Sequence, residues 1–360
     1  MKKELNVLVT AAGTQTMPGL ADCFHFNGER RIRVIGADAV VDPSLKQVVD
    51  ICCQVPYYDS PDYLECILDL CRRESVDIFF PFMDEELELI HNNLEKFESL
   101  GVKVAIPSED VIRITNDKLF FYQWLRNHHL PVPEFYEIDT VESIEDVCQK
   151  LGYPEKGVCI KTRFASGSRG VRILDEKADL YDIFLNRKPN SMVTNLGAFL
   201  DMCRKTNSFA GLMAMEYLPG AECSVDLLAE NGKILYMAGR GEEDVYASTP
   251  QSCKLMSIPK AYQIAEAVIQ ELRLDGNADL DFKYNEKGDP VLMEINPRIA
   301  ATMSVIAIGG INLPYLRIKQ LLGEKLPKLE PHYGVRMTRR YIDMFTDEQG
   351  ENLFWENTEV

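Results

Sequence analysis

The sequence lacks the regularly spaced cysteines and histidines that build metal centres or disulfide frameworks. Its ten cysteines are scattered, no Cys-x-x-Cys occurs, and its five histidines do not cluster near cysteine. Structural zinc sites and disulfide-rich secreted domains require such short spacings. We therefore expect most cysteines to be reduced and buried as small hydrophobic residues, with a catalytic thiol as the alternative.

Long apolar runs and an excess of positive charge are also missing. No stretch is long and apolar enough to cross a bilayer, and the formal net charge is −17. Because nucleic acids and anionic membranes favour basic patches, we expect neither as a partner. The start, MKKELNVLVTAAG, does not fit a signal peptide because Glu4 and Asn6 interrupt its apolar run. We expect a cytoplasmic protein, in which a local cluster of lysine and arginine can still bind phosphate.

What is present is a chain of 360 residues, 46% of them apolar, which is enough for two or three domains. The first third alternates apolar strands with helices, and this favours a compact α/β domain with a parallel sheet over residues 1–110. Four strands are expected, at the apolar run after Glu4 and at 33–37, 77–82 and 102–107, with later helices over 63–74 and 85–100.

The turn after the first strand lacks the full Gly-x-Gly-x-x-Gly of a dinucleotide site. Asp38 ends the second strand, where its carboxylate would meet a ribose or, alternatively, form a helix cap or turn. We favour the helix cap or turn.

Beyond residue 110 the pattern changes to an α+β region of mostly antiparallel hairpins. A helix over 118–128 is expected to begin after Asn116 or Asp117. Asn231-Gly232 separates two strands and predicts a hairpin turn. The expected helices here are 144–151, 178–184, 193–205 and 261–272, and the expected strands include 211–218, 222–230 and 233–240.

The last hairpin carries polar side chains on a strand that otherwise packs a core. In PVLMEINPRI, Glu294 and Asn296 leave one face while Met293 and Ile295 leave the other. If the turn NEKGD closes the pair, Asp281 lies across from Glu294 or one step away from it, and two carboxylates and an amide converge. Such oxygen groups suit Mg²⁺, and the alternative is a solvated hairpin face.

The segment FASGSRG, residues 164–170, is a Gly/Ser loop between two strands. Its small residues expose backbone N–H groups that can close over phosphates, although such a loop is often only a mobile turn. Lys161 on the entering strand can reach a phosphate. Lys118 lies near the start of its helix, where it opposes the helix dipole, so it has either a ligand-binding role or a plain surface position.

The segment MEYLPGAEC, residues 215–223, carries an apolar strand into a Pro-Gly bend. The exposed backbone at Glu216-Tyr217-Leu218 can hydrogen-bond an adenine edge, and Glu222 can bind ribose hydroxyls. The alternative is a plain turn.

The order of these motifs resembles that of the ATP-grasp superfamily. KTRFASGSRGV is similar to its phosphate-covering loop, EYLPGAECSVD to its adenine hinge, and LMEINPR to its magnesium strand. The chain most resembles the carbamoyl-phosphate-synthase-like carboxylate–amine ligases, over roughly residues 1–325. The resemblance implies a preATP-grasp (Rossmann-like) domain at 1–110, followed by an ATP-grasp fold with a lid subdomain at 111–210, a magnesium-site subdomain at 211–325 and a C-terminal strand and tail at 326–360.

The resemblance also implies a role for each matched residue, with ATP and Mg²⁺ (or Mn²⁺) as cofactors. Lys118 and Lys161 would bind nucleotide phosphates, and Arg298 would act with Lys161 on the transferring phosphoryl group. The other implied contacts are Gly167, Ser168 and Gly170 in the phosphate loop, Glu216, Tyr217 and Leu218 at adenine, Glu222 at ribose, and Asp281, Glu294 and Asn296 at magnesium.

The implied activity is an ADP-forming ligase that joins a small-molecule carboxylate to an amine through an acyl phosphate. Rival hypotheses are activation of bicarbonate or another small acid, and a module that binds ATP without turnover. Carbamoyl phosphate synthase large subunits carry two such modules in tandem and this chain has one, so we do not expect it to make carbamoyl phosphate alone. Those modules also use a different oxygen ligand where this chain has Asp281.

The sequence says less about which residues bind the substrate than about those that bind ATP. The segment 239–252 is acidic where related ligases often carry arginines. Arg240 is the candidate for holding a substrate carboxylate by a bidentate fork, and the alternative is a surface arginine paired with Glu242 or Glu243.

The C-terminal segment YGVRMTRRYIDMF is expected to be a strand that returns to the sheet. Its arginines Arg336, Arg339 and Arg340 would contact substrate or lie on a solvated face. We expect the tail ENLFWENTEV to dock either on the body of the protein or on a second subunit, and in the second case the protein would be a homodimer.

Overall fold

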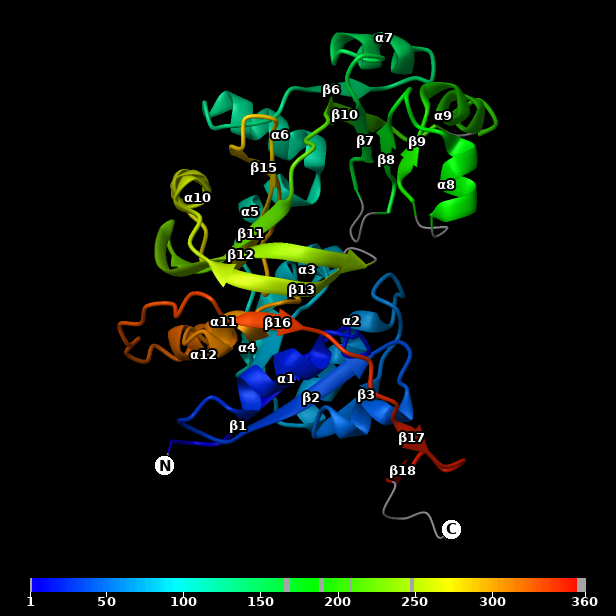
Figure 1. The fold of residues 1–360 in the computed structure, drawn as a ribbon. Helices are drawn as coiled ribbons and strands as arrows, with labels where there is room; N and C mark the ends of the chain where they lie inside the picture. Colours follow the sequence, from blue (N-terminus) through cyan, green and yellow to red (C-terminus); the bar gives the residue numbers. More distant parts are fainter. Residues whose placement is uncertain (1, 165–168, 188–190, 207–208, 247–248, 355–360) are drawn as a thin grey trace.

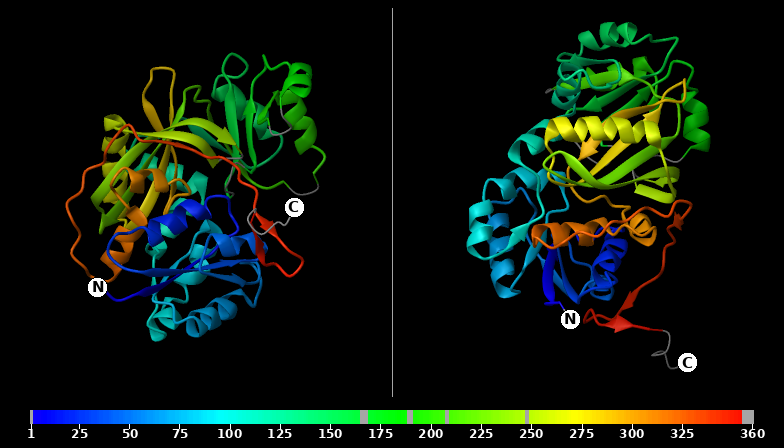
Figure 2. Two further views of the ribbon diagram at one scale, coloured as in Figure 1. Left: turned by 60° about the horizontal axis from the view of Figure 1, so that its bottom comes forward. Right: turned by 90° about the vertical axis from the view of Figure 1, so that its left-hand side faces the viewer.

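The structure is a computed structural model, and it describes residues 2–164, 169–187, 191–206, 209–246 and 249–354. The described residues form three larger sheets and one two-stranded sheet. In Figure 1 the N-terminal sheet lies at the bottom, the second sheet forms a small lobe at the top, and the third lies between them. Figure 2 shows the six-stranded middle sheet between the other two parts. In the described part of the chain no helix is long and apolar enough to span a membrane.

The N-terminal sheet is parallel throughout, with the strand order β3-β2-β1-β4-β5. Val7 and Val9 face a core shared with helix α1, while Leu8 faces a second core shared with helix α2. This confirms the expected α/β domain. The elements are β1 (Leu5–Val9), α1 (Met17–His25), β2 (Ile32–Asp38), η1 (Pro43–Gln47), β3 (Ile51–Gln54), α2 (Tyr63–Arg73), β4 (Ile78–Phe80), η2 (Asp84–Glu86), α3 (Leu87–His91), α4 (Leu94–Ser99) and β5 (Lys103–Val104).

Two details of this domain differ from the sequence prediction. The short strand β3 was missed, because ICCQ is a four-residue run without clear alternation. The helix expected over 85–100 is broken into η2, α3 and α4. Asn92 and Asn93 interrupt it, and the Asn93 side chain donates to the carbonyl of Leu89, a local bond that competes with helix continuation.

The second sheet has the order β6-β10-β7-β8-β9 and forms the small lobe. The helix expected over 193–205 is instead a short strand and a helix, because Asn195 accepts from the N–H of Ala198 and starts the helix there. The elements are α5 (Glu109–Asn116), α6 (Lys118–Asn127), β6 (Phe135–Ile138), α7 (Ser143–Lys150), β7 (Val158–Thr162), β8 (Val171–Leu174), α8 (Leu180–Asn186), β9 (Val193–Thr194), α9 (Leu196–Cys203) and β10 (Leu212–Glu216).

The third sheet is antiparallel, with the order β15-β14-β11-β12-β13-β16. Helix α10 packs on the apolar face that includes Leu280 and Phe282. The expected turn at Asn231-Gly232 is present, with both residues at positive φ. The elements are β11 (Glu222–Glu230), β12 (Lys233–Tyr246), β13 (Thr249–Met256), α10 (Pro259–Leu272), β14 (Gly276–Tyr284), β15 (Pro290–Asn296), α11 (Ser304–Ile308), α12 (Leu313–Leu321) and β16 (Arg336–Thr338).

The C-terminal segment crosses from the third sheet back to the N-terminal domain. Strand β16 pairs with β13, which confirms the expected returning strand. A small hairpin of β17 (Phe345–Thr346) and β18 (Asn352–Leu353) then lies against η1, where Lys46 pairs with Glu351 at 3.3 Å. The described part of the tail therefore docks on the body of its own chain.

Candidate functional site

The predicted metal residues come together on one face of the third sheet. In the register of β14 and β15, Asp281 lies opposite Glu294 and Asp279 lies opposite Asn296. The Asn296 amide donates to Asp281 Oδ2 at 3.2 Å, and Ser224 donates to Asp281 Oδ1 at 2.6 Å. The face expected from the alternation of β15 is therefore present, and its role as a metal site stays a prediction.

The electrostatics of this face fit a bound cation. Loss of solvent, followed by the nearby charges of Asp279 and Glu294, raises the pKa of Asp281 well above its ordinary value. A cation between these carboxylates would relieve that repulsion. Among the described residues, no group of three or more His, Cys, Asp or Glu side chains is arranged around a single metal position. Mg²⁺ bound together with substrate phosphates typically takes only one or two carboxylates from the protein and fills the rest of its octahedral shell with water and phosphate oxygens.

Lys118, at the start of α6, and Lys161, on β7, both lie near Glu294. Lys118 Nζ lies 3.1 Å from Glu294 Oε2. Burial alone would raise the pKa of Glu294, but the charges of Lys118 and Lys161 help to hold it below its ordinary value. Lys161 is buried on β7. The two predicted phosphate lysines and the predicted metal strand therefore form one charged cluster.

Helix α6 is held so that Lys118 faces β15. Asp117 caps the helix by accepting from the N–H groups of Leu119 and Phe120. The buried Tyr122 hydroxyl donates to the Met293 carbonyl at 2.8 Å, which ties the helix to the strand. Arg163 also pairs with Asp117, with Nε 3.2 Å from Oδ1. No local pattern in the sequence predicts this role of Arg163, and the only signal is its position two residues after Lys161.

The phosphate loop is only partly within the described residues. Gly167 and Ser168 lie outside them, so their predicted roles are not tested by the structure. Gly170 closes the loop at φ +69°, and a Cβ there would lie 2.5 Å from the Thr162 side chain. Arg169 reaches the N-terminal domain, with Nη2 3.5 Å from Glu85 Oε1.

The predicted adenine hinge forms the bend between β10 and β11. The Glu216 carboxylate accepts from the N–H of Glu134 at 3.0 Å, so this side chain braces the hinge. Leu218 is buried and Tyr217 is exposed at the bend. Glu222, predicted for the ribose, pairs with Lys283 at 3.0 Å. The side chain of Glu216 thus serves local structure, while the backbone of the hinge is the part predicted to bind adenine.

Arg240 is buried rather than on the surface, so the alternative of a surface arginine is wrong. Its side chain is 3% exposed. Its Nε lies 2.9 Å from Asp226 Oδ2, and its Nη2 lies 3.2 Å from both carboxylate oxygens of Asp279. The guanidinium is therefore held by two carboxylates, and the strand register, in which Ser224 pairs with both Arg240 and Asp281, places it on the same face of the sheet as Asp281. Its predicted contact with a substrate carboxylate is not tested by these bonds.

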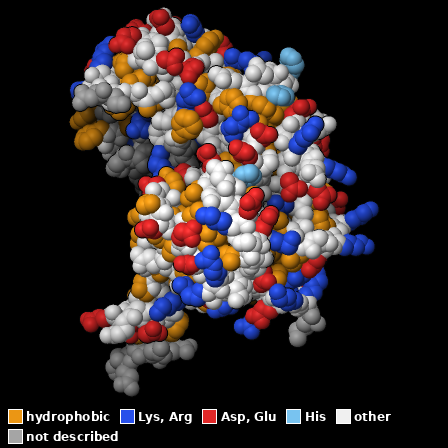
Figure 3. All heavy atoms as spheres, turned by 180° about the vertical axis from the view of Figure 1, so that it is seen from behind, with side chains coloured by type: hydrophobic (Ala, Val, Ile, Leu, Met, Phe, Trp, Pro, Cys, Tyr) orange, Lys and Arg blue, Asp and Glu red, His pale blue; other side chains and the backbone are white. Residues whose placement is uncertain are grey.

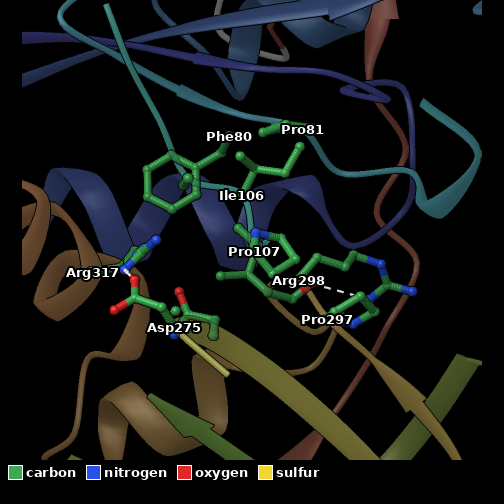
Figure 4. Close-up of a pocket in the computed structure, with 12 residues that line it drawn as sticks. Phe80, Pro81, Ile106, Pro107, Asp275, Pro297, Arg298 and Arg317 are labelled. Atoms are coloured by element: carbon green, nitrogen blue, oxygen red, sulfur yellow. Dashed lines mark hydrogen bonds and ion pairs between the residues drawn. The ribbon is translucent and has the colours of Figure 1, made fainter. Parts of the chain in front are cut away.

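Arg298 follows β15 and turns toward the N-terminal domain. Its Nη2 lies 3.1 Å from Asp84 Oδ2, and its Nη1 donates to the carbonyl of Ile299. The guanidinium also lies over the Phe82 ring, 5.8 Å from the centroid. Beneath it is a cavity of about 10 Å³, shown in Figure 4 between Arg298 on one side and the Arg317–Asp275 pair on the other.

The sequence analysis did not associate Asp84 with Arg298. The only signal in the sequence is the acidic run DEE, residues 84–86, shortly after the strand expected over 77–82. The other aspartate considered early, Asp38, accepts from the N–H groups of Gly13 and Val40 and so forms a turn. Its ribose alternative is not supported by these bonds.

The three C-terminal arginines make contacts within the chain. Arg336 pairs with Glu243, and Arg339 donates to the carbonyls of Pro250 and Ala301. Arg340 is exposed. On the face in Figure 3, acidic and basic side chains are interspersed without a continuous basic patch, and a hollow separates the small lobe from the body.

The chain is similar to known protein families and to curated proteins over most of its length. A family model described as "ATP-grasp in the biosynthetic pathway with Ter operon" matches residues 208–341, and one described as "PylC-like, N-terminal domain" matches residues 7–105. Among relatives, the arginine-specific carbamoyl phosphate synthase large chain of Bacillus subtilis (strain 168) is 22% identical over 292 residues, which is 77% of this chain and 26% of that one. The large chain of Rubrobacter xylanophilus is 25% identical over 325 residues, 86% of this chain and 28% of that one.

Solved structures share the fold over most of the chain. An ADP complex of N5-carboxyaminoimidazole ribonucleotide synthetase has a TM-score of 0.64 at 15% identity, covering 91% of this chain and 79% of that one. Biotin carboxylase from Campylobacter jejuni has a TM-score of 0.66 at 16% identity, and the match covers 92% of this chain and 73% of that one. An L-amino acid ligase from Bacillus licheniformis has a TM-score of 0.62 at 16% identity, and the match covers 89% of this chain and 75% of that one.

The chain spans about a quarter of the length of the carbamoyl phosphate synthase chains it matches. The parallel N-terminal domain and the antiparallel sheet that follows it agree with both family matches. This protein is a member of the ATP-grasp superfamily, distantly related to the carbamoyl phosphate synthase large chain.

Proposed function

We propose that this chain is an ATP-dependent, ADP-forming carboxylate–amine ligase acting on a small metabolite or an amino acid. The observation that carries the proposal is the face where Asp281, Glu294 and Asn296 meet, with Lys118 3.1 Å from Glu294. Carboxylates crowded in this way favour a cation, and the adjacent lysine favours an anion. A magnesium–triphosphate complex supplies both charges to one site.

Each residue of this cluster has a defined task under the proposal. Lys118 and Lys161 bind phosphate oxygens as point charges. Asp281, Glu294 and Asn296 hold Mg²⁺, or alternatively Mn²⁺, which when bound neutralises charge on the phosphates. Arg298 donates to the phosphoryl group during transfer, where charge on its equatorial oxygens must be stabilised.

The proposed reaction has two displacements. A substrate carboxylate oxygen attacks the γ-phosphorus, the bond to the leaving oxygen of ADP breaks, and an acyl phosphate forms. An amine then attacks the acyl carbon, inorganic phosphate leaves, and the amine loses a proton to give an amide. The acyl phosphate hydrolyses in open water, so the loop that ends at Gly170 would have to close over it.

The substrate assignment is supported by likeness of fold and by the Arg240 position. The solved structures of this fold include an L-amino acid ligase, whose name implies the joining of two amino acids. They also include carboxylases, one of them solved with bicarbonate, which keeps bicarbonate activation as the second candidate. Arg240 remains our candidate for orienting a substrate carboxylate, either directly or through Asp226 and Asp279.

Release of ADP from Mg-ATP tests the proposal. The chain is incubated with amino acids and small acids singly, with amines singly, with bicarbonate, and with acid–amine pairs. ADP formation that requires one acid together with one amine is expected. Formation with bicarbonate alone would favour the second candidate, and ATP binding without turnover in any mixture would favour a binding module.

A further inference from the structure

The loop that follows β4 is fixed by a buried carboxylate that the proposed reaction does not use. Glu86 is fully buried. It accepts from the Thr10 hydroxyl at 2.5 Å, from the Tyr63 hydroxyl, and from the N–H groups of Phe82 and Met83 at 2.9 and 3.1 Å. Because these donors come from the residue that follows β1, from α2 and from the loop itself, they fix residues 82–86 at the end of the parallel sheet.

This fixed loop presents Asp84 to Arg298. Asp84 Oδ2 lies 3.1 Å from Arg298 Nη2, and both side chains are less than one-fifth exposed. Within the described residues, Asp84 Oδ1 and Arg298 Nε are buried without a hydrogen-bond partner. A guanidinium has five N–H donors. Asp84 holds one N–H of Nη2 and the Ile299 carbonyl holds one N–H of Nη1, which leaves a second N–H on each of these nitrogens for a ligand oxygen.

We propose that Asp84 is a positioning residue that fixes the Arg298 guanidinium for contact with the terminal phosphate of a nucleoside triphosphate. The inference rests on the proposed function, because it is there that Arg298 is assigned to the transferring phosphoryl group. Glu86 contributes through the loop and touches no ligand. The N-terminal domain thereby sets the geometry of a residue carried by the ATP-grasp sheet.

The physical reason lies in the flexibility of arginine. A free arginine side chain samples many rotamers, and ordering it on a ligand costs conformational entropy. The Asp84 contact, with the Phe82 ring below the guanidinium, restricts those rotamers before the ligand arrives. A preordered donor favours the triphosphate over the diphosphate, because only the triphosphate has the terminal group that this donor reaches.

The test compares binding of Mg-ADP with binding of a non-hydrolysable Mg-ATP analogue by isothermal titration calorimetry. It uses the wild-type chain, Asp84→Asn, Asp84→Ser and a control, Glu88→Gln, which removes an exposed carboxylate on α3. We expect the wild type and Glu88→Gln to prefer the triphosphate by the same factor. Both Asp84 variants should lose that preference by roughly fivefold or more while their affinity for ADP changes less than twofold. Unchanged circular dichroism would show that the variants fold.

The outcomes separate this inference from the proposed function. If the wild type binds neither nucleotide, the proposed function fails and the inference fails with it. If the wild type binds both without preferring the triphosphate, Arg298 does not contact the terminal phosphate. If the wild type prefers the triphosphate and the Asp84 variants keep or increase that preference, the inference alone is overturned. An increase would mean that Asp84 competes with phosphate for Arg298.

Discussion

Lys118 and Glu294 form an ion pair, with Nζ 3.1 Å from Oε2, between the start of α6 and the strand β15. The two residues were assigned from separate motifs, one to the nucleotide phosphates and the other to magnesium. Their contact brings the phosphate-binding and metal-binding parts of the predicted site together. The positive charge of Lys118 and the negative charge of Glu294 compensate each other within the site.

Replacing Glu294 should remove activity with little effect on the fold. Glu294→Gln keeps the shape of the side chain but removes the charge that Lys118 and a metal would share. We expect ADP release to fall by roughly 100-fold or more, since losing even an outer-shell partner of a metal typically costs 10- to 100-fold. The melting temperature should change by only a few degrees.

The matched control is Glu286→Gln, which removes an exposed carboxylate from the turn of the same hairpin. Its ADP release should equal that of the wild type. Normal turnover in Glu294→Gln would contradict the metal assignment of this face.

Replacing Arg240 should destabilise the protein strongly. Arg240→Met leaves Asp226 and Asp279 buried on the sheet without the guanidinium that holds both. Removing one partner of a buried ion pair typically costs about 3–5 kcal/mol, and we expect a loss of that size in the free energy of unfolding in urea. Arg240→Lys keeps the charge and should lose less. A loss below about 1 kcal/mol in Arg240→Met would contradict this account of the buried cluster.

The elements that alternate or repeat over short range could be predicted from the sequence. Strand β11 has the bounds expected for it, and β14 pairs with β15 in the register that places Asp281 opposite Glu294. Both cases depend on the two-residue period of a strand and on short turns, which are local properties. The resemblance of the ordered motifs to a known superfamily added the assignment of ATP.

The parts that could not be predicted depend on contacts between distant segments. Asp84 and Arg298 are more than two hundred positions apart, and no local pattern indicates that they meet. The buried position of Arg240 depends on Asp226 and Asp279 from two other strands. A single sequence gives the side-chain types on each strand, but only the packed sheet determines which charges become partners.

Glu29 should make stability depend on pH in the acid range. Hydrogen bonds from Lys2, then from Lys319, outweigh partial burial and lower the pKa of Glu29 from 4.5 to about 2. Because the folded state favours the ionised form, this stabilisation is complete above about pH 5 and is lost as the pH falls toward 2. The carboxylate is about one-third exposed, so solvent screening limits its contribution to the order of 1 kcal/mol.

The measurement is urea unfolding of the wild type and Glu29→Gln at pH 7 and near pH 2. The variant should be less stable than the wild type at pH 7, and the difference should shrink at the lower pH. Glu98→Gln, which changes an exposed carboxylate on α4, is the control. An equal difference at both pH values would mean that the charge of Glu29 is not what stabilises the fold.

Gly170 and Gly288 are a matched pair of glycines for testing how tightly residue 170 packs against its neighbours. Both have positive φ, +69° and +76°, which an alanine adopts at a cost of about 1–2 kcal/mol. A Cβ at Gly170 would lie 2.5 Å from Thr162, whereas a Cβ at Gly288 would have no described neighbour within 4 Å. Gly170→Ala should therefore destabilise the protein by roughly 1–3 kcal/mol more than Gly288→Ala. It should also weaken ATP binding, because the new Cβ would shift the backbone at the end of the loop predicted to cover the phosphates. The double variant Gly170→Ala with Thr162→Ala removes the two contacts at 2.5 Å and leaves the Thr162 Cβ at 3.0 Å and the unfavourable φ, so it should recover part of the stability that Gly170→Ala loses relative to Thr162→Ala alone. Equal stability of the two single alanine variants would contradict the tight packing of residue 170 against Thr162.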